Sequence, residues 1–139
     1  MIRPLAPADL EQIVELSSDL SAPWAARVDR AWFEGELRAG QGVGLFFDEL
    51  VAMLFYRVGP DIIEITFLMT SSTVSRRGLM KKLFSHYLAE IAQGMPTWLE
   101  VHEANQPALS FYLDLGFVER GRRERYYPDG GAAIALQLG

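Results

Sequence analysis

The sequence contains no cysteine, and this absence excludes several kinds of chemistry at once. Without cysteine the chain of 139 residues cannot form a disulfide, a thiolate metal site or a thiolate nucleophile. The sequence also has only two histidines, which leaves little for a histidine-rich metal site. We therefore expect no metal ion at the functional site.

Long apolar runs are also missing. No segment approaches the roughly 18 consecutive apolar residues of a membrane-spanning helix, and the N-terminal residues MIRPLAPADL lack the basic-then-apolar pattern of a signal peptide. We expect a soluble, cytoplasmic protein that does not bind membranes. Half of the residues are apolar, and a chain of this length buries roughly two thirds of its unfolded surface. These features predict one domain over residues 1–139.

The net charge of −5 argues against general nucleic-acid binding, yet the positive charges are concentrated. Eight of the thirteen Lys and Arg residues lie in two short windows. The windows contain Arg76, Arg77, Lys81 and Lys82, and Arg120, Arg122, Arg123 and Arg125. Such local clusters suit a small anion better than a polymer. The glycine patterns of the P-loop and of dinucleotide-binding folds are absent.

Hydrophobic periodicity predicts helices spaced among strands. Strands are expected at 2–5, 43–47, 50–58, 62–70, 97–102, 117–127 and 133–138, with a tight hairpin turn at Asp48 and Glu49. Helices are expected from Pro7 to about Asp19, from Asp29, from Gly78 to about residue 93, and from Asn105 to Gly116. This order predicts an α/β (α+β) fold with a mixed sheet and helices on its faces.

The segments 62–70, 78–93 and 97–102 form a βαβ unit, so their two strands should be parallel. The helix N-terminus then lies at the carboxyl edge of both strands, where its N–H groups favour an anion. Arg76, Arg77 and Lys81 add full charges there. A phosphate or pyrophosphate is the expected ligand, although a basic segment before a helix is more often only solvated and binds no ligand.

The strand at 97–102 carries an unusual carboxylate. Leu99 and Val101 should point to one face, and Glu100 and His102 to the other, because side chains alternate along a strand. Tyr112 follows on the next helix. Taken singly, Glu100 is more often a solvated strand residue and Tyr112 more often a core residue. Together they could move protons.

Two motifs and the order of elements resemble the GNAT superfamily of acyl-CoA-dependent N-acetyltransferases over nearly the whole chain. SRRGLMKKLF, at residues 75–84, looks like the pyrophosphate loop of that family. LEVHEANQPALSFYLDLGF, at residues 99–117, is similar to its last core motif. Within the superfamily, LEV, YLDLGF, RRERYYPDG and the APW at residues 22–24 look closest to the bacterial ribosomal-protein alanine N-acetyltransferases.

This resemblance implies a mixed, mostly antiparallel central sheet of about seven strands with about four helices on its faces. It implies transfer of acetyl from acetyl-CoA, the co-substrate, to a primary amine, with Glu100 as the base and Tyr112 as the acid. The acceptor is expected to be a small molecule or a protein N-terminus. The cofactor-binding residues that it implies are Leu68, Met69, Thr70, Ser75, Arg76, Arg77, Gly78, Leu79, Met80, Lys81, Asn105 and Tyr112.

Three alternatives remain open from the residues alone. His102 shares the face of Glu100 and could be the base itself. Ser75 and Met80 depart from the family pattern, so the chain could be an acyl-CoA-binding or interaction module without catalysis. The arginine cluster at 120–125 either is a solvated strand face or borders the acceptor site together with Tyr126. The sequence does not fix the oligomeric state.

Overall fold

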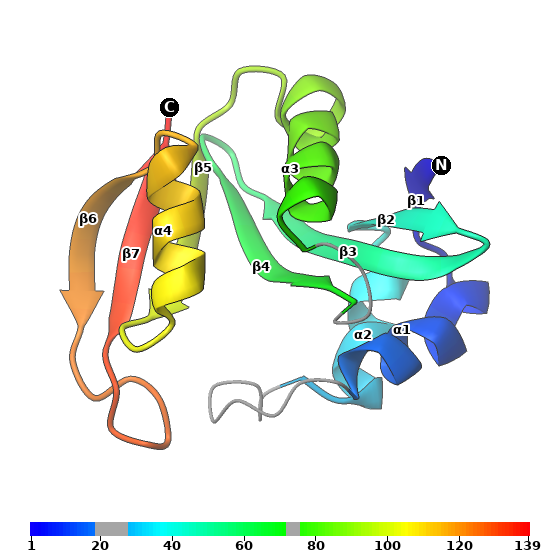
Figure 1. Ribbon diagram of the computed structural model, residues 1–139, viewed down its shortest axis with the longest axis horizontal. Helices are drawn as coiled ribbons and strands as arrows, with labels where there is room; N and C mark the ends of the chain where they lie inside the picture. The colour runs from blue at the N-terminus through cyan, green and yellow to red at the C-terminus, as the bar shows by residue number, and fades with distance from the viewer. Residues whose placement is uncertain (19–27, 72–75) are drawn as a thin grey trace.

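Seven strands form a single sheet in the computed structural model, which describes residues 1–18, 28–71 and 76–139 (Figure 1). The strands are β1 (Ile2–Pro4), β2 (Gly42–Phe47), β3 (Glu49–Val58), β4 (Ile63–Thr70), β5 (Thr97–His102), β6 (Val118–Arg123) and β7 (Ala133–Leu138). Their order across the sheet is β1-β2-β3-β4-β5-β7-β6. All neighbours are antiparallel except β4 and β5, which are parallel. The expected mixed, mostly antiparallel sheet of seven strands is confirmed.

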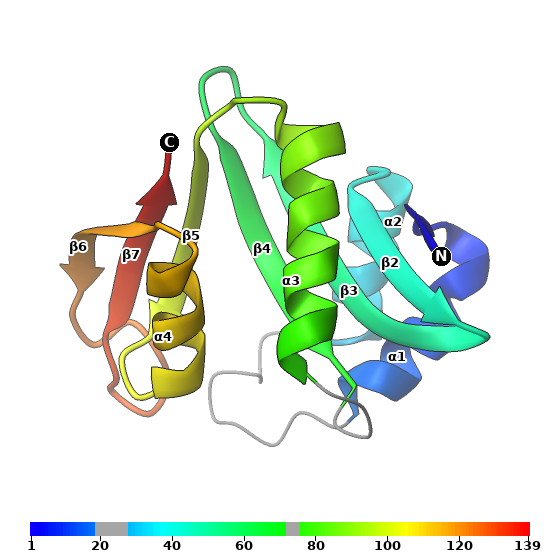
Figure 2. The ribbon, with the colours of Figure 1, turned by 45° about the horizontal axis from the view of Figure 1, so that its top comes forward.

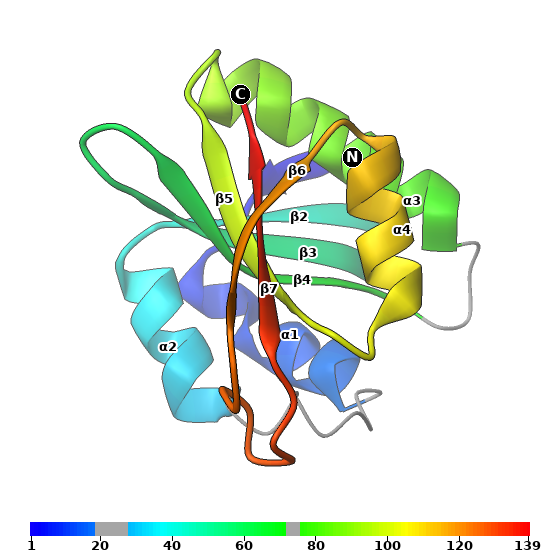
Figure 3. The ribbon, with the colours of Figure 1, turned by 90° about the vertical axis from the view of Figure 1, so that its left-hand side faces the viewer.

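Helices cover both faces of the sheet. They are α1 (Leu10–Ser17), which follows a 3-10 turn at Pro7–Asp9, α2 (Arg30–Arg38), α3 (Arg76–His86), which continues as a π-helical segment at Tyr87–Ala92, and α4 (Gln106–Asp114). Figures 2 and 3 show α3 and α4 on one face and α1 and α2 on the other. Each face has its own cluster of buried apolar side chains. None of the helices in the described segments is long and apolar enough to cross a membrane.

Local signals account for several element boundaries. Asp29 begins α2 by accepting a hydrogen bond from the Trp32 N–H at 2.8 Å, and Asn105 accepts one from the Ala108 N–H at 3.4 Å at the start of α4. The β2–β3 hairpin turns at Asp48, whose φ is +61°. Aspartate tolerates this left-handed conformation better than most residues, so the tight turn forms without glycine.

Two expected boundaries were wrong. α3 begins at Arg76 rather than at Gly78, so the expected pyrophosphate loop already lies partly within the helix. The strand expected at 117–127 ends at Arg123. Arg125 has a φ of +53°, and the N–H groups of Tyr126 and Tyr127 both donate to the Gly131 carbonyl. These contacts close a loop where the sequence analysis predicted a continued strand.

The parallel strands β4 and β5 pair only at their beginnings. The register joins Ile63 to Thr97 and Glu64 to Trp98, and no later pair between these two described strands is present. Figure 1 shows the two strands diverging from that point. Because β5 continues to pair with β7 and β4 with β3, the sheet stays intact on either side. The divergence leaves the facing backbone edges of β4 and β5 without strand partners.

Candidate active site

Glu100 lies on β5, two residues beyond its last pairing with β4. Leu99 and Val101 belong to the apolar cluster beneath α3 and α4, so Glu100 points to the opposite face of the sheet. Its side chain is only 13% exposed. Across the sheet its neighbours in register are Ala135 on β7 and then Gly121 on β6. A Cβ atom added at Gly121 would meet no atom within 4 Å, so there is room on the sheet beside the carboxylate.

Within residues 1–18, 28–71 and 76–139, one charged group contacts this carboxylate. The Nε atom of Arg123 lies 3.1 Å from Oε2 of Glu100. Among the described residues, however, no hydrogen bond of acceptable geometry reaches this buried oxygen. The contact is therefore a charge interaction without an aligned N–H, and Oε2 keeps the capacity to accept a proton or a hydrogen bond. A carboxylate in this condition can act as a base, whereas a fully hydrogen-bonded one is held in place.

His102 shares the face of Glu100, but both of its ring nitrogens are engaged. Nδ1 accepts a hydrogen bond from the Ala104 N–H at 3.0 Å, and Nε2 lies 2.8 and 3.0 Å from the two carboxylate oxygens of Asp129. With Nδ1 as an acceptor, Nε2 carries the hydrogen and donates it to Asp129. The ring is 3% exposed and stacks on Tyr127. These contacts tie the β6–β7 loop to the end of β5, and they favour Glu100 over His102 as a base.

Glu103 lies on the other side of the sheet from Glu100. Its carboxylate accepts hydrogen bonds from the Ala132 N–H and from Arg122, whose Nη2 lies 3.2 Å away. These two donors hold the pKa of Glu103 below its usual value, with the backbone N–H as the larger cause. The arginine cluster is thus divided between the two faces: Arg123 contacts Glu100, and Arg122 contacts Glu103.

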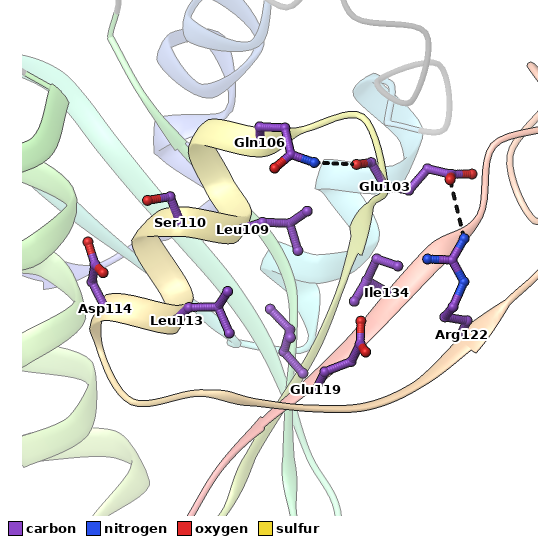
Figure 4. A pocket seen from close by; sticks show the side chains of 10 residues that line it. Glu103, Gln106, Leu109, Ser110, Leu113, Asp114, Glu119, Arg122 and Ile134 are labelled. Atoms are coloured by element: carbon purple, nitrogen blue, oxygen red, sulfur yellow. Dashed lines mark hydrogen bonds and ion pairs between the residues drawn. The ribbon is translucent and has the colours of Figure 1, made fainter.

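An open hollow of about 550 Å³ lies on the face of Glu103, between α4 and strands β6 and β7 (Figure 4). Apolar side chains such as Leu109, Leu113 and Ile134 line it together with the Glu103–Arg122 pair. Neither Glu100 nor Tyr112 belongs to its lining. The hollow is therefore separate from the carboxylate that sequence reasoning selected.

Tyr112 projects from α4 into an aromatic cluster with Phe84, Phe111 and Phe117. It is 6% exposed, and this burial raises the pKa of its phenol well above the usual value. The phenol therefore remains protonated at neutral pH and can donate a hydrogen bond.

Glu100 and Tyr112 approach the sheet from opposite faces. Tyr112 belongs to the apolar cluster of Leu99 and Val101, and Glu100 points the other way. The two side chains can act on the same substrate only where the sheet is open between its faces. The β4–β5 pairing ends two residues before Glu100, so strand pairing does not close the sheet at this position.

Comparison with known proteins identifies the family. The sequence profile of the acetyltransferase (GNAT) family matches residues 10–117. The chain belongs to the GNAT family. A curated relative, the uncharacterized protein ML0378 of Mycobacterium leprae, is 29% identical over 146 aligned residues, which include 98% of this chain but only 39% of the relative. This GNAT chain thus spans about two fifths of that relative.

Solved structures confirm the GNAT fold. The ribosomal-protein-S18-alanine N-acetyltransferase of Escherichia coli superposes with a TM-score of 0.86 at 25% identity, covering 99% of this chain and 92% of that one. Arabidopsis thaliana NAA60 in complex with acetyl-CoA superposes with a TM-score of 0.81 at 17% identity, covering 99% and 98%. The GNAT family consists of acetyltransferases, so the expected enzyme class, with acetyl-CoA as its co-substrate, is confirmed at the level of the family.

The residues expected to bind acetyl-CoA lie on both sides of the divergence. On β4, Met69 is buried among the side chains under α1 and α2, whereas Leu68 packs under α3 and α4. Thr70 is half-buried at the end of this strand. Their backbone edge toward β5 has no strand partner, so it is the part of β4 that this GNAT chain can offer to a ligand.

The first turns of α3 carry the other expected cofactor contacts. Gly78 and Lys81 are exposed, Met80 is half-buried, and Leu79 is buried in the core, so Leu79 can contact a ligand only through its backbone. Arg76 and Arg77 begin the helix. Ser75 and the segment 22–24 lie outside the described residues. Asn105 uses its side-chain oxygen to cap α4.

Two buried oxygens fit a polar ligand at the divergence. Thr66 Oγ1 and Glu100 Oε2 are buried, and each lacks an aligned hydrogen-bond partner among the described residues. Each residue lies two positions beyond the last β4–β5 pair of its strand. A buried polar atom without a partner is costly, and the amide, thioester or amine groups of the two substrates would provide partners. The residues present therefore fit acetyl-CoA.

Sequence reasoning missed two contacts at this site. It named the cluster at 120–125 but not the pairing of Arg123 with Glu100, and it did not name Asp129. The Asp129-Gly130-Gly131 sequence was the available signal, because it indicates a tight loop that can return to β5. The Gly131 N–H donates to Asp129, and a Cβ at Gly131 would collide with the ring of His102.

Proposed function

We propose that this GNAT protein transfers the acetyl group of acetyl-CoA to a primary amine, and that the amine is a protein N-terminus. The amine attacks the thioester directly, so no covalent enzyme intermediate is needed. The protein-N-terminal acceptor is supported by the similarity to the E. coli enzyme, whose name states an N-acetyltransferase of a ribosomal-protein alanine. Acetyl-CoA approaches from the face of α3 and α4, and the acceptor from the face of Glu100.

The main support for this proposal is the burial of Glu100 and its lack of a full set of hydrogen-bond partners among the described residues. An amine must lose a proton to attack, and an N-terminal amine has a pKa near 8, so most of it is ammonium at neutral pH. Glu100 is a mostly buried carboxylate beside the divergence of β4 and β5, with an oxygen that no aligned donor from the described residues occupies. It can take the proton directly or through a water molecule. General base catalysis of this kind contributes roughly a hundredfold or more in rate.

Tyr112 acts on the departing thiolate. A thiol has a pKa near 8.5, and burial raises the pKa of the Tyr112 phenol above its usual value. The phenol is therefore the weaker acid of the two. It stabilises the thiolate by donating a hydrogen bond, and the released CoA thiolate takes its proton from solvent. We expect a backbone N–H between Leu68 and Thr70 to donate a hydrogen bond to the oxyanion.

The test is release of CoA thiol with acetyl-CoA and a peptide bearing a free N-terminal alanine. The protein has no cysteine, so a thiol reagent detects CoA alone. We expect Glu100→Gln to lower kcat by about a hundredfold at pH 7. The loss should shrink toward pH 9, where more of the amine is already neutral. Tyr112→Phe should lower kcat by roughly tenfold or more, with little change with pH.

Matched controls separate these roles from packing. Glu103→Gln alters a carboxylate close to Glu100 on the other face, and Tyr56→Phe alters a half-buried phenol on β3. Both controls should keep kcat within about threefold of the wild type, because neither group lies at the divergence. Equal rates in the wild type, Glu100→Gln and Tyr112→Phe would overturn the assigned roles.

A second function is favoured by one observation. Met80 lies in the first turns of α3, where the family resemblance implies a small residue and where its side chain can crowd a pyrophosphate. A protein that binds acyl-CoA without catalysis would show thermal stabilisation by CoA but no thiol release with any amine. Met80→Gly should then raise CoA affinity without producing turnover. Turnover by the wild type excludes this alternative.

A further inference from the structure

The contact between Arg123 and Glu100 joins two side chains of very different exposure. Glu100 is 13% exposed, and Arg123 is 60% exposed. Arg123 is the last residue of β6, which is the edge strand of the sheet, and its guanidinium carbon lies 5.5 Å from the centre of the Tyr126 ring. A cation on an edge strand can be reached by a ligand from solvent while it still contacts the buried carboxylate.

The register explains how Arg123 reaches Glu100. Arg123 lies opposite Ala133, which lies opposite His102, so Arg123 shares the face of the sheet with Glu100. The next row contains Glu100, Ala135 and Gly121. The two small residues leave space between the carboxylate and the edge of the sheet, and the side chain of Arg123 crosses that space diagonally. An acceptor that approaches Glu100 from the β6 edge of the sheet therefore meets Arg123.

The charge of Arg123 has two consequences for an acceptor. An approaching ammonium group is repelled by the guanidinium, and the guanidinium competes with it for the carboxylate of Glu100. An acceptor that carries its own carboxylate reverses both effects. Its carboxylate pairs with Arg123, and the carboxylate of Glu100 is then available to the amine. Guanidinium and carboxylate groups match each other in geometry as well as charge.

We propose that Arg123 selects acceptors that carry a carboxylate close to the reacting amine, and that this carboxylate replaces Glu100 as the partner of Arg123. The proposal rests on the acetyl transfer proposed above and names its substrate class. The favoured acceptor is a protein N-terminus whose second residue is Asp or Glu. A free acidic amino acid carries the same chemistry and is a separate arm of the test.

The experiment compares kcat/KM for peptides that are identical except at the second residue, which is Glu, Gln or Lys after an N-terminal alanine. In the wild type we expect kcat/KM to be about fivefold higher for Glu than for Gln, as suits a partly exposed ion pair. The Lys peptide should be the poorest acceptor. The preference should appear mainly in KM and should weaken as salt is raised.

Arg123→Gln should abolish the preference, so that kcat/KM becomes equal for the Glu and Gln peptides whatever its absolute value. Arg123→Lys, which keeps the charge, should retain part of it. Arg122→Gln is the matched control, because Arg122 lies on the same strand and contacts Glu103 on the other face, and it should retain the full preference. Free glutamate and glutamine, tested in the same way, show whether the peptide backbone is also required.

The outcomes separate this inference from the proposed function. Equal kcat/KM for the Glu and Gln peptides in the wild type overturns the inference and leaves acetyl transfer standing. A preference that persists in Arg123→Gln also overturns it. Absence of thiol release with every amine overturns the proposed function and the inference together.

Discussion

Glu100 and Glu103 are only three residues apart, and each contacts an arginine of β6, yet their surroundings differ. Glu103 accepts hydrogen bonds from both the Ala132 N–H and Arg122. Among the residues that the structure describes, Glu100 has a single charge contact, with Arg123, and one buried oxygen without an aligned donor. The two faces of one short segment thus carry a satisfied and an unsatisfied carboxylate. A satisfied carboxylate stabilises a loop, and an unsatisfied one is available for proton transfer.

His102 lies between these two residues in sequence and provides the strongest test of the comparison. His102→Leu removes the partner of the Ala104 N–H and of Asp129. We expect the free energy of unfolding to fall by about 1–3 kcal/mol, because the hydrogen bonds of the ring to the Ala104 N–H and to Asp129 are both lost. Urea unfolding measures this loss. Any fall in kcat should be far smaller than in Glu100→Gln, whereas an equal fall in kcat would make His102 the base.

Much of this arrangement follows from local sequence patterns. Alternation along β5 placed Glu100 opposite Leu99 and Val101, and the apolar cluster confirms that placement. The βαβ unit was confirmed by the parallel register of β4 and β5, and the buried run at 62–70 became the central strand of the sheet. The two-residue period of a strand, the 3.6-residue period of a helix and the helix caps all depend on residues that are close in sequence. The sequence alone can therefore predict them.

The contacts that distinguish the two carboxylates could not be predicted in this way. Arg123 reaches Glu100 because β7 inserts between β5 and β6 in the sheet. That order brings together residues 23 positions apart and depends on the whole fold. The same limit applies to the divergence of β4 from β5, since no local pattern marks Glu64 and Trp98 as the last pair. The sequence predicted the strands and helices that carry these residues, and the long-range packing determined which side chains are in contact.

Replacing each glutamate by glutamine tests whether the two carboxylates also differ in their contribution to stability. Glu103→Gln keeps the shape of the side chain but weakens two charge-assisted hydrogen bonds, so the Tm should fall by about 2–5 °C. Glu100→Gln removes only a charge contact without an aligned hydrogen bond, and its Tm should stay within about 1 °C of the wild type. Thermal denaturation at pH 7 measures both. The reverse ranking would mean that Glu100 is held in place and Glu103 is not.

We expect the smallest effect on Tm from lowering the pH, and this experiment tests how much the negative charge of Glu103 contributes to stability. The Ala132 N–H and Arg122 hold the pKa of Glu103 below its usual value in the folded protein. A carboxyl group whose pKa is lowered by folding contributes stability above its unfolded pKa, near 4.3, and loses that contribution as the pH falls through the folded value. The Tm difference between wild type and Glu103→Gln should therefore be complete at pH 6 and shrink toward pH 3. The other described carboxyl groups with lowered pKa values, Asp9, Glu11 and Asp129, are present in both proteins and largely cancel in the difference. A difference that stays constant between pH 6 and pH 3 would show that the ionised carboxylate of Glu103 contributes nothing, and that Glu103 stabilises the loop by packing alone.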